Sequence, residues 1–369
     1  MLRALKNNDY TASSLIIIII SALLMGVNGI IAFLIFFFIS EQQFGRDPIN
    51  KHGLAKGKSR LGGLAIALSV IIGCCLHLFF QKELGYQALF MELKPTIFLS
   101  LFVGLIGLVE DFNQNLSSVK RLTLMLFLVL IGLYMMPELI PINLPIFELV
   151  NLNDSYVVIY LFTVLMICGF INAGNMADGA NGLLATIFFG FFVVAYSLDN
   201  SIFNFSVIIS LIAFIIFNVV TGKIFLGDFG AYAFSTLVAL KSLEFYANND
   251  LSVFFLGSIL VYPCFEIIRS MIVRSLKKSS LMNPDNNHLH NLINTFLCSK
   301  GLPKHIANSL TGLGLAIITI SAPLALYFTG FSIESEYWRT VFIMQILFLS
   351  LIYIFFEKKF SADTNRCYN

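Results

Sequence analysis

Long apolar runs alternate with short polar stretches along almost the whole chain. A helix that crosses a membrane needs about 20 predominantly apolar residues, and many of the runs approach this length. The pattern predicts an all-α polytopic integral membrane protein with about eleven transmembrane helices, some of which need flanking residues to complete the crossing. We expect the spans at residues 13–39, 61–80, 95–109, 122–136, 155–172, 183–198, 203–220, 231–246, 252–272, 307–330 and 340–356.

The composition supports this class and excludes others. Hydrophobic residues make up 58% of the chain and charged residues 12%, with a mean hydropathy of +0.85, whereas a soluble domain carries about 25% charged residues. The net charge of +2 is too small for binding nucleic acid through phosphate contacts. The six cysteines lack metal-ligand spacing and are interpreted as packed thiols. Because no polar segment is long enough for a separate domain, residues 1–369 are expected to form a single transmembrane unit.

Lysine and arginine are distributed unevenly between the two sets of loops that these spans create. One set carries most of them, and the positive-inside rule places that set in the cytoplasm. We therefore expect the N-terminus outside and the C-terminus in the cytoplasm. The first apolar run is too long for the core of a signal peptide, so we expect it to remain as a helix.

The loops predicted to face the cytoplasm carry compact polar strings, whereas the outer loops do not. Ionisable groups at membrane depth are costly and usually functional, so we expect the chemistry of the protein at this face. The strings lie near residues 40–60, 110–121, 172–182, 221–230 and 273–306.

The residue types in these strings are those of phosphoryl transfer. Carboxylates and amide carbonyls are hard oxygen ligands that suit Mg²⁺, which leaves room for substrate phosphates. Basic side chains neutralise phosphates, and positioning with charge neutralisation accounts for most of the catalysis in such reactions. The candidate oxygen ligands are Glu110, Asp111, Asn175, Asp178, Asn181 and Asp228, and the candidate cations include Arg60, Lys120 and Arg274.

Other polar residues have simpler interpretations. His288 and His290 lie two positions apart and do not share a helix face, so a phosphate or ribose contact is favoured over a zinc pair. Glu266 and Arg269 lie three apart and are expected to neutralise each other. Lys241 is expected to extend toward the outer surface.

Five strings in this order resemble the polyprenyl-phosphate N-acetylhexosamine-1-phosphate transferase family, which includes undecaprenyl-phosphate GlcNAc-1-phosphate transferases and the phospho-MurNAc-pentapeptide translocase. The resemblance runs from about Arg60 to His290. It rests on Arg60-Leu61-Gly62-Gly63, on Glu110-Asp111 with Lys120, on Asn175-x-x-Asp178-Gly179-x-Asn181-Gly182, on Phe225-x-Gly227-Asp228 and on His288-Leu289-His290.

The resemblance implies a role for each matching position. Asp228 and Asn175 would hold Mg²⁺, or Mn²⁺ in its place. Asp178 would be catalytic at the nucleotide end of the site, where Asn181 binds the donor. Asp111, with Glu110, would lie where the polyprenyl phosphate attacks. The substrate-binding set would include Arg60, Lys120, Arg274, His288 and His290.

Three departures from the family pattern are visible. The first acidic loop begins with Glu110 where many relatives have aspartate, which weakens the argument for a dedicated role of this residue. Asn181 replaces an aspartate of many bacterial members, although eukaryotic GlcNAc-1-phosphate relatives also have asparagine there. Asn291 replaces a third histidine. All three side chains are polar, and we predict an active enzyme.

The implied reaction transfers a HexNAc-1-phosphate from a UDP-sugar to undecaprenyl phosphate at the cytoplasmic face of a bacterial inner membrane, releases UMP and initiates a lipid-linked surface glycan. A simple sugar donor is favoured over a pentapeptide-bearing donor, and a homodimer is an open expectation. One alternative is a transporter, but transporters place helix-breaking polar residues near the midplane of paired repeats, and no internal repeat is visible here. The other alternative is an inactive relative.

Overall fold

The computed structural model describes residues 11–42, 44–46, 57–80, 94–113, 116–141, 155–276, 287–330 and 336–360. These residues form helices, connecting turns and two isolated β-bridges, as expected for an all-α protein. The helices are α2 (Ala12–Leu24), α3 (Gly26–Ser40), α4 (Gly62–Phe80), α6 (Pro95–Asn113), α7 (Ser118–Tyr134), η1 (Pro137–Leu139), α9 (Tyr156–Ala177), α10 (Leu183–Asp199), α11 (Ile202–Thr221), α12 (Gly227–Ala247), α13 (Val253–Ile259), α14 (Val261–Leu276), α15 (Leu289–Ser299), α16 (Lys304–Phe328) and α17 (Glu336–Phe360).

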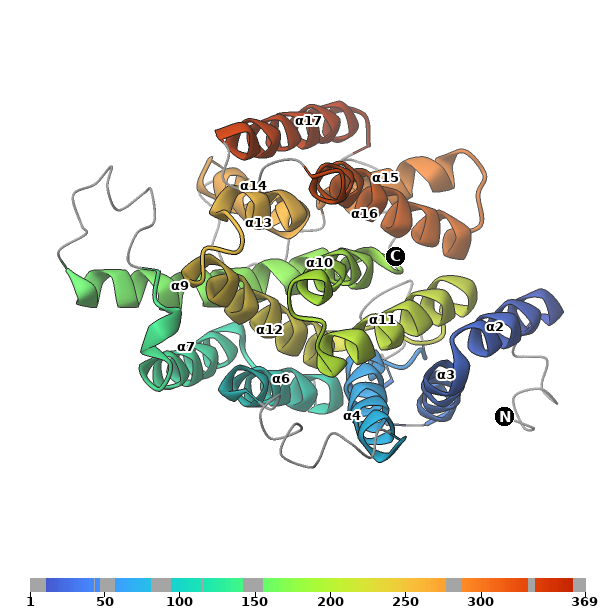
Figure 1. Cartoon of the computed structure of the whole chain (residues 1–369). Helices are drawn as coiled ribbons and strands as arrows, with labels where there is room; N and C mark the ends of the chain where they lie inside the picture. Colours follow the sequence, from blue (N-terminus) through green and yellow to red (C-terminus); the bar gives the residue numbers. More distant parts are fainter. Residues whose placement is uncertain are drawn as a thin grey trace.

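Helix α12 lies in the middle of the molecule and packs against α4, α6, α9 and α10 (Figure 1). Glycines allow two of these helices to approach it closely. A Cβ on Gly63 would lie 2.1 Å from the Cα of Gly230, and one on Gly107 would lie 2.3 Å from the carbonyl oxygen of Asp228. Helices α4 and α6 therefore contact the backbone of the first turn of α12, which is the turn that begins with the predicted metal-binding motif.

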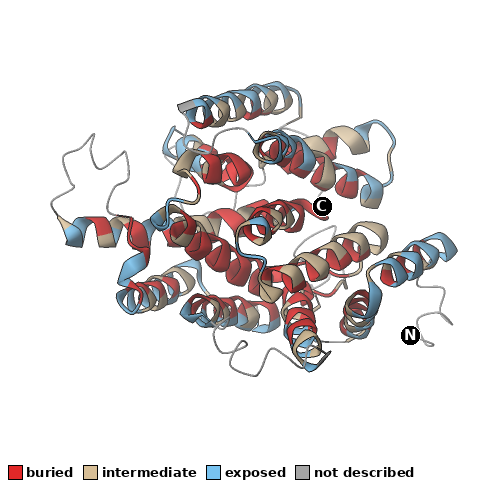
Figure 2. Cartoon of the chain, in the orientation of Figure 1, coloured by how far each residue is buried: buried red, intermediate tan, exposed pale blue. Residues whose placement is uncertain are grey.

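Buried residues are concentrated in the middle helices, and the peripheral helices expose apolar side chains (Figure 2). Ile19 and Leu24 on α2 and Leu351 on α17 are examples, with more than half of their surface exposed. Large exposed apolar areas are unusual on a soluble monomer, whereas lipid tails solvate them readily. This distribution supports a membrane protein.

Among the described helices, six are long and apolar enough to cross a membrane, and a seventh span is possible if α13 and α14 count as one. Helices α2, α3 and α10 are apolar but shorter. The membrane class agrees with the sequence-based prediction, while the larger number of spans and the orientation remain predictions.

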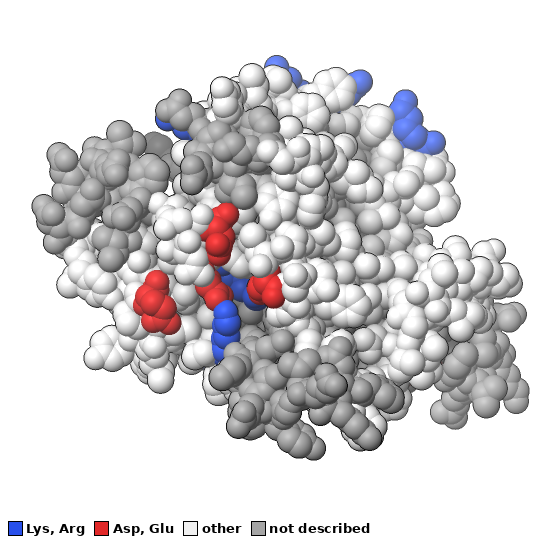
Figure 3. All heavy atoms as spheres, in the orientation of Figure 1, with Lys and Arg blue, Asp and Glu red and all other residues white. Residues whose placement is uncertain are grey.

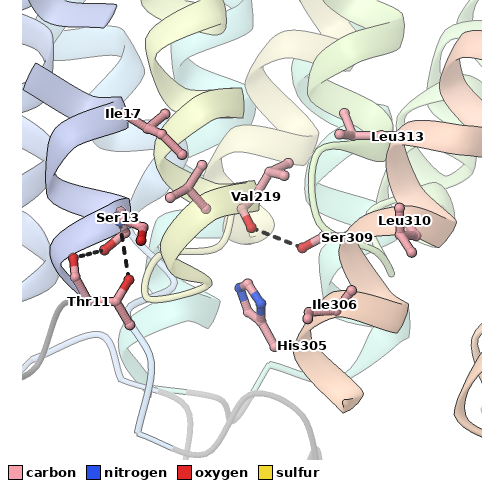
Figure 4. A pocket seen from close by; sticks show the side chains of 11 residues that line it. Thr11, Ser13, Ile17, Val219, His305, Ile306, Ser309, Leu310 and Leu313 are labelled. Carbon is pink, nitrogen blue, oxygen red and sulfur yellow. Dashed lines mark hydrogen bonds between the residues drawn. The ribbon is translucent and has the colours of Figure 1, made fainter. Parts of the chain in front are cut away.

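The segment 13–39, predicted as one span, consists of two helices that break at Met25. Thr11 and Ser13, at the start of α2, line a cavity of about 350 Å³ together with Val219 of α11 and His305 of α16 (Figure 4). These parts of α11 and α16 lie at the end of the molecule that carries the predicted motifs. The end of α3 also lies there, because Arg46 Nη2 donates to the carbonyl oxygen of Ser40. The segment is therefore not one straight crossing.

Two other predicted elements differ from the structure. The span 252–272 is broken into α13 and α14, which meet at an angle of 85° around Leu260. The loop 273–306 contains the helix α15. The tertiary packing of these short helices is not visible in an apolar run.

Charged side chains also gather near the middle of the face seen in Figure 3. At the C-terminal end of α12, Lys241 Nζ lies 3.6 Å from Asp199 Oδ2, and Lys94 pairs with Glu244. The side chain of Lys241 is only 7% exposed, and its ammonium group is held by Asp199, the last residue of the neighbouring helix α10. Whether Lys241 points toward the outer surface depends on the orientation of the protein and stays a prediction.

Candidate active site

Asp111 binds the first turn of α12. Its side chain, at the end of α6, is buried and accepts the backbone N–H groups of Asp228 at 3.0 Å and Phe229 at 2.9 Å. The first N–H groups of a helix have no partner within the helix, and a negative charge there interacts favourably with the helix dipole. Asp111 therefore caps α12 and fixes the backbone position of Asp228.

Arg60 connects Asp111 with Asp228. Its Nε lies 3.2 Å from Asp111 Oδ1 and its Nη2 lies 3.1 Å from Asp228 Oδ1. The preceding Ser59 exchanges backbone hydrogen bonds with Lys223 at 3.1 Å and Phe225 at 2.8 Å. The segment before α4 is thus pinned to the loop before α12, and this pairing aims the guanidinium at the two carboxylates.

A second guanidinium reaches Asp228 from α7. Arg121 Nη1 lies 3.4 Å from Asp228 Oδ2 and donates to the hydroxyl of Tyr232 at 3.3 Å. The predicted cation Lys120 is exposed on the same helical turn. Successive residues on a helix point about 100° apart, so only one member of the Lys120-Arg121 pair faces the cluster. The sequence-based analysis chose Lys120 and missed Arg121.

Asp178 completes a cluster of three aspartates. It follows the last residue of α9 and accepts a hydrogen bond from the backbone of Gly227. Burial of its carboxyl group, followed by the nearby charges of Asp228 and Asp111, raises the pKa of Asp178 well above its ordinary value, while Arg60 acts in the opposite direction. Burial and the two neighbouring carboxylates together therefore outweigh the effect of Arg60 at Asp178.

Two further predicted residues lie close to this cluster along the chain. Glu110 is buried and accepts the backbone N–H of Leu116 at 3.0 Å, which holds the end of α6 to the residues before α7. Asn175 is half-buried on α9, three residues before Asp178, and positions three apart lie on the same side of a helix.

Asn181 points in another direction. Its amide Nδ2 donates to Ser309 Oγ at 3.0 Å, and that hydroxyl donates to the carbonyl of Val219 at 3.1 Å. The buried Oδ1 atom of Asn181 has no hydrogen-bond partner among the described residues. This side chain therefore anchors the central segment to α16 and α11. Arg274 lies half-buried in the last turn of α14.

The histidine motif packs against the central segment. The rings of His288 and His290 are stacked, with centroids 5.3 Å apart and planes 6° from parallel. A Cβ on Gly179 would lie 1.9 Å from His290 Nε2, so this imidazole lies directly beside the residue that follows Asp178. Burial, followed by the neighbouring His288, lowers the pKa of His290 to about 3.

Glu266 and Arg269 contact each other, with Arg269 Nη2 3.2 Å from Glu266 Oε2, as their spacing predicted. They are not an isolated pair, however, because His288 Nδ1 lies 2.9 Å from the same oxygen. The contact between this pair and the histidine motif was not predicted, since the two segments are separated by residues that carry no pairing signal.

The donor set of the aspartate cluster fits Mg²⁺ in its chemistry. Its carboxylates are hard oxygen ligands, and Mg²⁺ usually needs only one or two of them besides substrate phosphates. No group of three His, Cys, Asp or Glu side chains encloses a metal site by itself within the described parts of the chain. Both oxygens of Asp228 contact guanidinium groups, so a metal ion at Asp228 would compete with Arg60 or Arg121.

Comparisons with known proteins point to one family. Residues 94–246, which include Asp111, Asp178 and Asp228, match the model of glycosyl transferase family 4. The chain is 27% identical over 297 residues to the phospho-N-acetylmuramoyl-pentapeptide-transferase of Staphylococcus carnosus, covering 71% of this chain and 89% of that protein. It is 29% identical over 258 residues to the enzyme of the same name from Fervidobacterium nodosum, covering 65% and 75%. The chain is therefore similar to glycosyl transferase family 4 in its central part and to phospho-N-acetylmuramoyl-pentapeptide-transferases over about two thirds of its length.

Proposed function

We propose that this protein transfers an N-acetylhexosamine-1-phosphate group from a UDP-sugar to undecaprenyl phosphate. An oxygen of the lipid phosphate attacks the sugar-bearing phosphorus of the donor, the diphosphate bond breaks, and UMP leaves. The observation that supports this most directly is the meeting of Asp111, Asp178 and Asp228 with Arg60 and Arg121 at one end of a helical membrane protein. Carboxylates and guanidinium groups together suit the binding of phosphates and their counter-ion.

Mg²⁺, or Mn²⁺ in its place, would be held by Asp228 and Asn175 and would neutralise the donor diphosphate. Burial is the main cause of the raised pKa of Asp178, but the nearby charges of Asp228 and Asp111 add to it, and a bound cation would relieve this repulsion. Arg60 and Arg121 already contact Asp228. When the donor binds, these guanidinium groups can exchange the carboxylate for phosphate oxygens.

The two other aspartates have different proposed roles. The second pKa of a phosphate monoester is about 6, so the acceptor phosphate is largely a dianion at neutral pH and needs no strong base. The contacts of Asp111 with the backbone of α12 and with Arg60 support a positioning role. Asp178 accepts one backbone N–H, from Gly227, and has a raised pKa, so it is the better candidate to receive the proton when the acceptor binds as its monoanion. Glu110 holds the end of α6 to the residues before α7.

The remaining residues would bind the ends of the donor. Arg274 would contact a phosphate, and the exposed Lys120 would make at most a weak, solvent-screened contact. Asn181 would order the central segment beneath the nucleotide. His288 and His290 would close the site from the last cytoplasmic loop. We expect residues between 273 and 306 to recognise the sugar, because this part of the chain begins in the last turn of α14 and contains both histidines.

A pentapeptide-bearing donor is the second candidate, since the relatives named above carry this substrate in their names. The His288-Leu289-His290 string resembles the simple-sugar branch of the family, and this favours UDP-HexNAc. The proposed product would initiate a lipid-linked surface glycan at the cytoplasmic face of a bacterial inner membrane. The protein acts there as a monomer or a homodimer.

The test is UMP release by the purified protein in detergent with undecaprenyl phosphate and Mg²⁺. The donors are UDP-GlcNAc, UDP-GalNAc, UDP-6-deoxy-HexNAc sugars and UDP-MurNAc-pentapeptide. We expect UMP with one simple-sugar class, and only when lipid phosphate and Mg²⁺ are both present. UMP formed only from the pentapeptide donor would establish the second candidate. If the folded protein binds UDP-sugars without releasing UMP, the inactive-relative interpretation replaces the proposal, and transmembrane flux of a UDP-sugar would favour a transporter.

A further inference from the structure

Glu266 lies at the centre of a largely buried network between α14, α15 and α17. Its side chain is 0% exposed, yet both of its oxygens have several donors. Oε1 accepts the Tyr262 hydroxyl at 3.1 Å and the backbone N–H of Leu289 at 2.8 Å. Oε2 accepts Arg269 Nε at 3.2 Å. A buried carboxylate is tolerated when its charge is paired and its lone pairs are filled, and this one meets both conditions.

The network determines which nitrogen of His288 carries a proton. His288 Nδ1 lies 2.9 Å from Glu266 Oε2 and 3.0 Å from Arg269 Nη2. A carboxylate oxygen can only accept, and a guanidinium nitrogen can only donate. Arg269 already donates to the same carboxylate oxygen. A proton on Nδ1 of His288 therefore avoids placing a nitrogen lone pair against the oxygen of Glu266.

The same carboxylate acts on His290 through Tyr262. The tyrosine hydroxyl donates its single proton to Glu266 Oε1, so it must accept a hydrogen bond from His290 Nδ1, which lies 3.0 Å away. His290 therefore carries its proton on Nδ1. Its Nε2 atom then carries the lone pair and lies beside Gly179 in the central segment.

We propose that Glu266 is a positioning residue that holds both imidazoles with Nδ1 protonated, and that Nε2 of His290 accepts a hydrogen bond from a hydroxyl or amide N–H group of the sugar nucleotide. The identity of this ligand rests on the proposed function. A phosphate has no proton to donate at neutral pH, so a neutral Nε2 acceptor is suited to the hydroxyl-bearing parts of the donor and not to its diphosphate. The low pKa of His290 is consistent with a neutral ring.

The first test measures the tautomers of His288 and His290 and needs no substrate. The chain has five histidines, so ¹⁵N-histidine NMR of the detergent-solubilised protein is feasible, with signals assigned by His288→Gln and His290→Gln. We expect Nδ1–H for His290 in the wild-type protein. Tyr262→Phe should move only the His290 signals, while Glu266→Gln should move both. An Nε2–H signal for wild-type His290, or signals that do not respond to Glu266→Gln, would overturn the proposal.

A matched control and a fallback keep this test decisive. Arg269 Nη1 donates to the hydroxyl of Tyr353 at 3.3 Å, and this hydroxyl donates to Glu357 at 2.9 Å. Glu357→Gln therefore makes the same chemical change at the outer end of the network, and it should leave both histidine signals unchanged. If Glu266→Gln does not fold, Tyr262→Phe tests the link to His290 while the carboxylate stays in place.

The second test measures how the variants recognise the UDP-sugar donor. Removing residues that orient functional groups typically costs about 10- to 100-fold in activity. We expect kcat/KM for the UDP-sugar to fall by this factor in Glu266→Gln, mainly through KM, with the wild-type value kept in Glu357→Gln. A donor analogue that lacks the recognised hydroxyl should bind the wild-type protein and Glu266→Gln equally weakly. An unchanged KM in Glu266→Gln would contradict the role in donor binding. If the wild-type protein turns over no donor, the proposed function fails and the NMR result still decides the tautomers.

Discussion

At the scale of single residues, the three aspartates differ in how their charges are held. Asp111 is satisfied by two backbone N–H groups and Arg60, and Asp228 by two guanidinium groups. Asp178 accepts a single backbone N–H, from Gly227, and experiences the repulsion of both other aspartates. Residues of one chemical type therefore separate into a structural support, a candidate ligand and a candidate acid–base group because their surroundings differ.

Substitution of Asp228 should impair the site and leave the rest of the fold intact. We expect Asp228→Asn to lower Mg²⁺-dependent UMP release by at least about 100-fold, a typical cost of removing one electrostatic contact to the reacting groups. The protein should still insert and purify normally, because the backbone contacts of Asp111 with α12 remain. The matched control is Asp199→Asn at the other end of the molecule, which should retain turnover. Normal turnover in Asp228→Asn would refute the metal assignment.

Lys120 and Arg121 give a direct comparison between sequence and structure. Arg121 contacts Asp228 and Tyr232, whereas Lys120 is exposed. We expect Arg121→Gln to reduce kcat/KM by about 10- to 100-fold, as the loss of a charge-assisted phosphate contact of roughly 1.5–3 kcal/mol implies. Lys120→Gln should stay within about threefold of the wild type. The reverse order, measured in the same UMP assay, would favour the sequence-based choice.

The low pKa of His290 predicts how stability depends on pH. The folded protein keeps this ring neutral down to about pH 3, while an unfolded histidine titrates near pH 6.5. The unfolded state therefore binds one more proton between these values. Stability falls as the pH decreases, with a contribution from this residue of about 1.4 kcal/mol per pH unit. Thermal unfolding between pH 7.5 and 4.5 should show a shallower decline for His290→Gln. Parallel curves for the two proteins would contradict the prediction.

At the scale of elements, apolar length predicts helices well but not their breaks. The helices from α4 to α12 follow the predicted spans because burial in lipid demands continuous apolar sequence. The breaks at Met25 and Leu260 lie inside apolar runs, and at the first of them Gly26 adopts a positive φ of 65°. For the site, the aspartates could be found from composition and spacing. Arg121 and Glu266 could not, because their importance comes from which helix face meets another element.

Glycine contacts between helices make a prediction at this scale. Gly63 meets the backbone of Gly230, which cannot move aside as a flexible side chain could. Overpacking of this kind costs about 1–3 kcal/mol, so Gly63→Ala should lower the thermal midpoint in detergent and reduce turnover. Gly169→Ala is the control, because no atom lies within 4 Å of its Cβ position and alanine favours helix. An unchanged midpoint for Gly63→Ala would show that α4 and α12 can separate without cost.

At the scale of the whole molecule, α12 connects two charged ends. Asp228 lies in its first turn and Glu244 lies about 24 Å further along the axis, at a rise of 1.5 Å per residue. The first end holds the aspartate cluster and the second holds the salt bridges of Lys241 and Lys94. Because the distance approaches the thickness of a bilayer core, about 30 Å, the two ends are expected to face opposite sides of the membrane.

Cysteine labelling of intact cells tests this arrangement and the positive-inside prediction together. In a background in which the six cysteines are replaced, Ser118→Cys places a thiol at the exposed start of α7, near the candidate site, and Asn248→Cys places one at the exposed end of α12. A membrane-impermeant maleimide should label Asn248→Cys in cells whose outer membrane, where one is present, has been opened. It should label Ser118→Cys only after the inner membrane is permeabilised. The proposed donor is a soluble nucleotide sugar of the cytoplasm. Labelling in the opposite order would place the aspartate cluster on the side without this substrate and would refute the proposed reaction as well as the orientation.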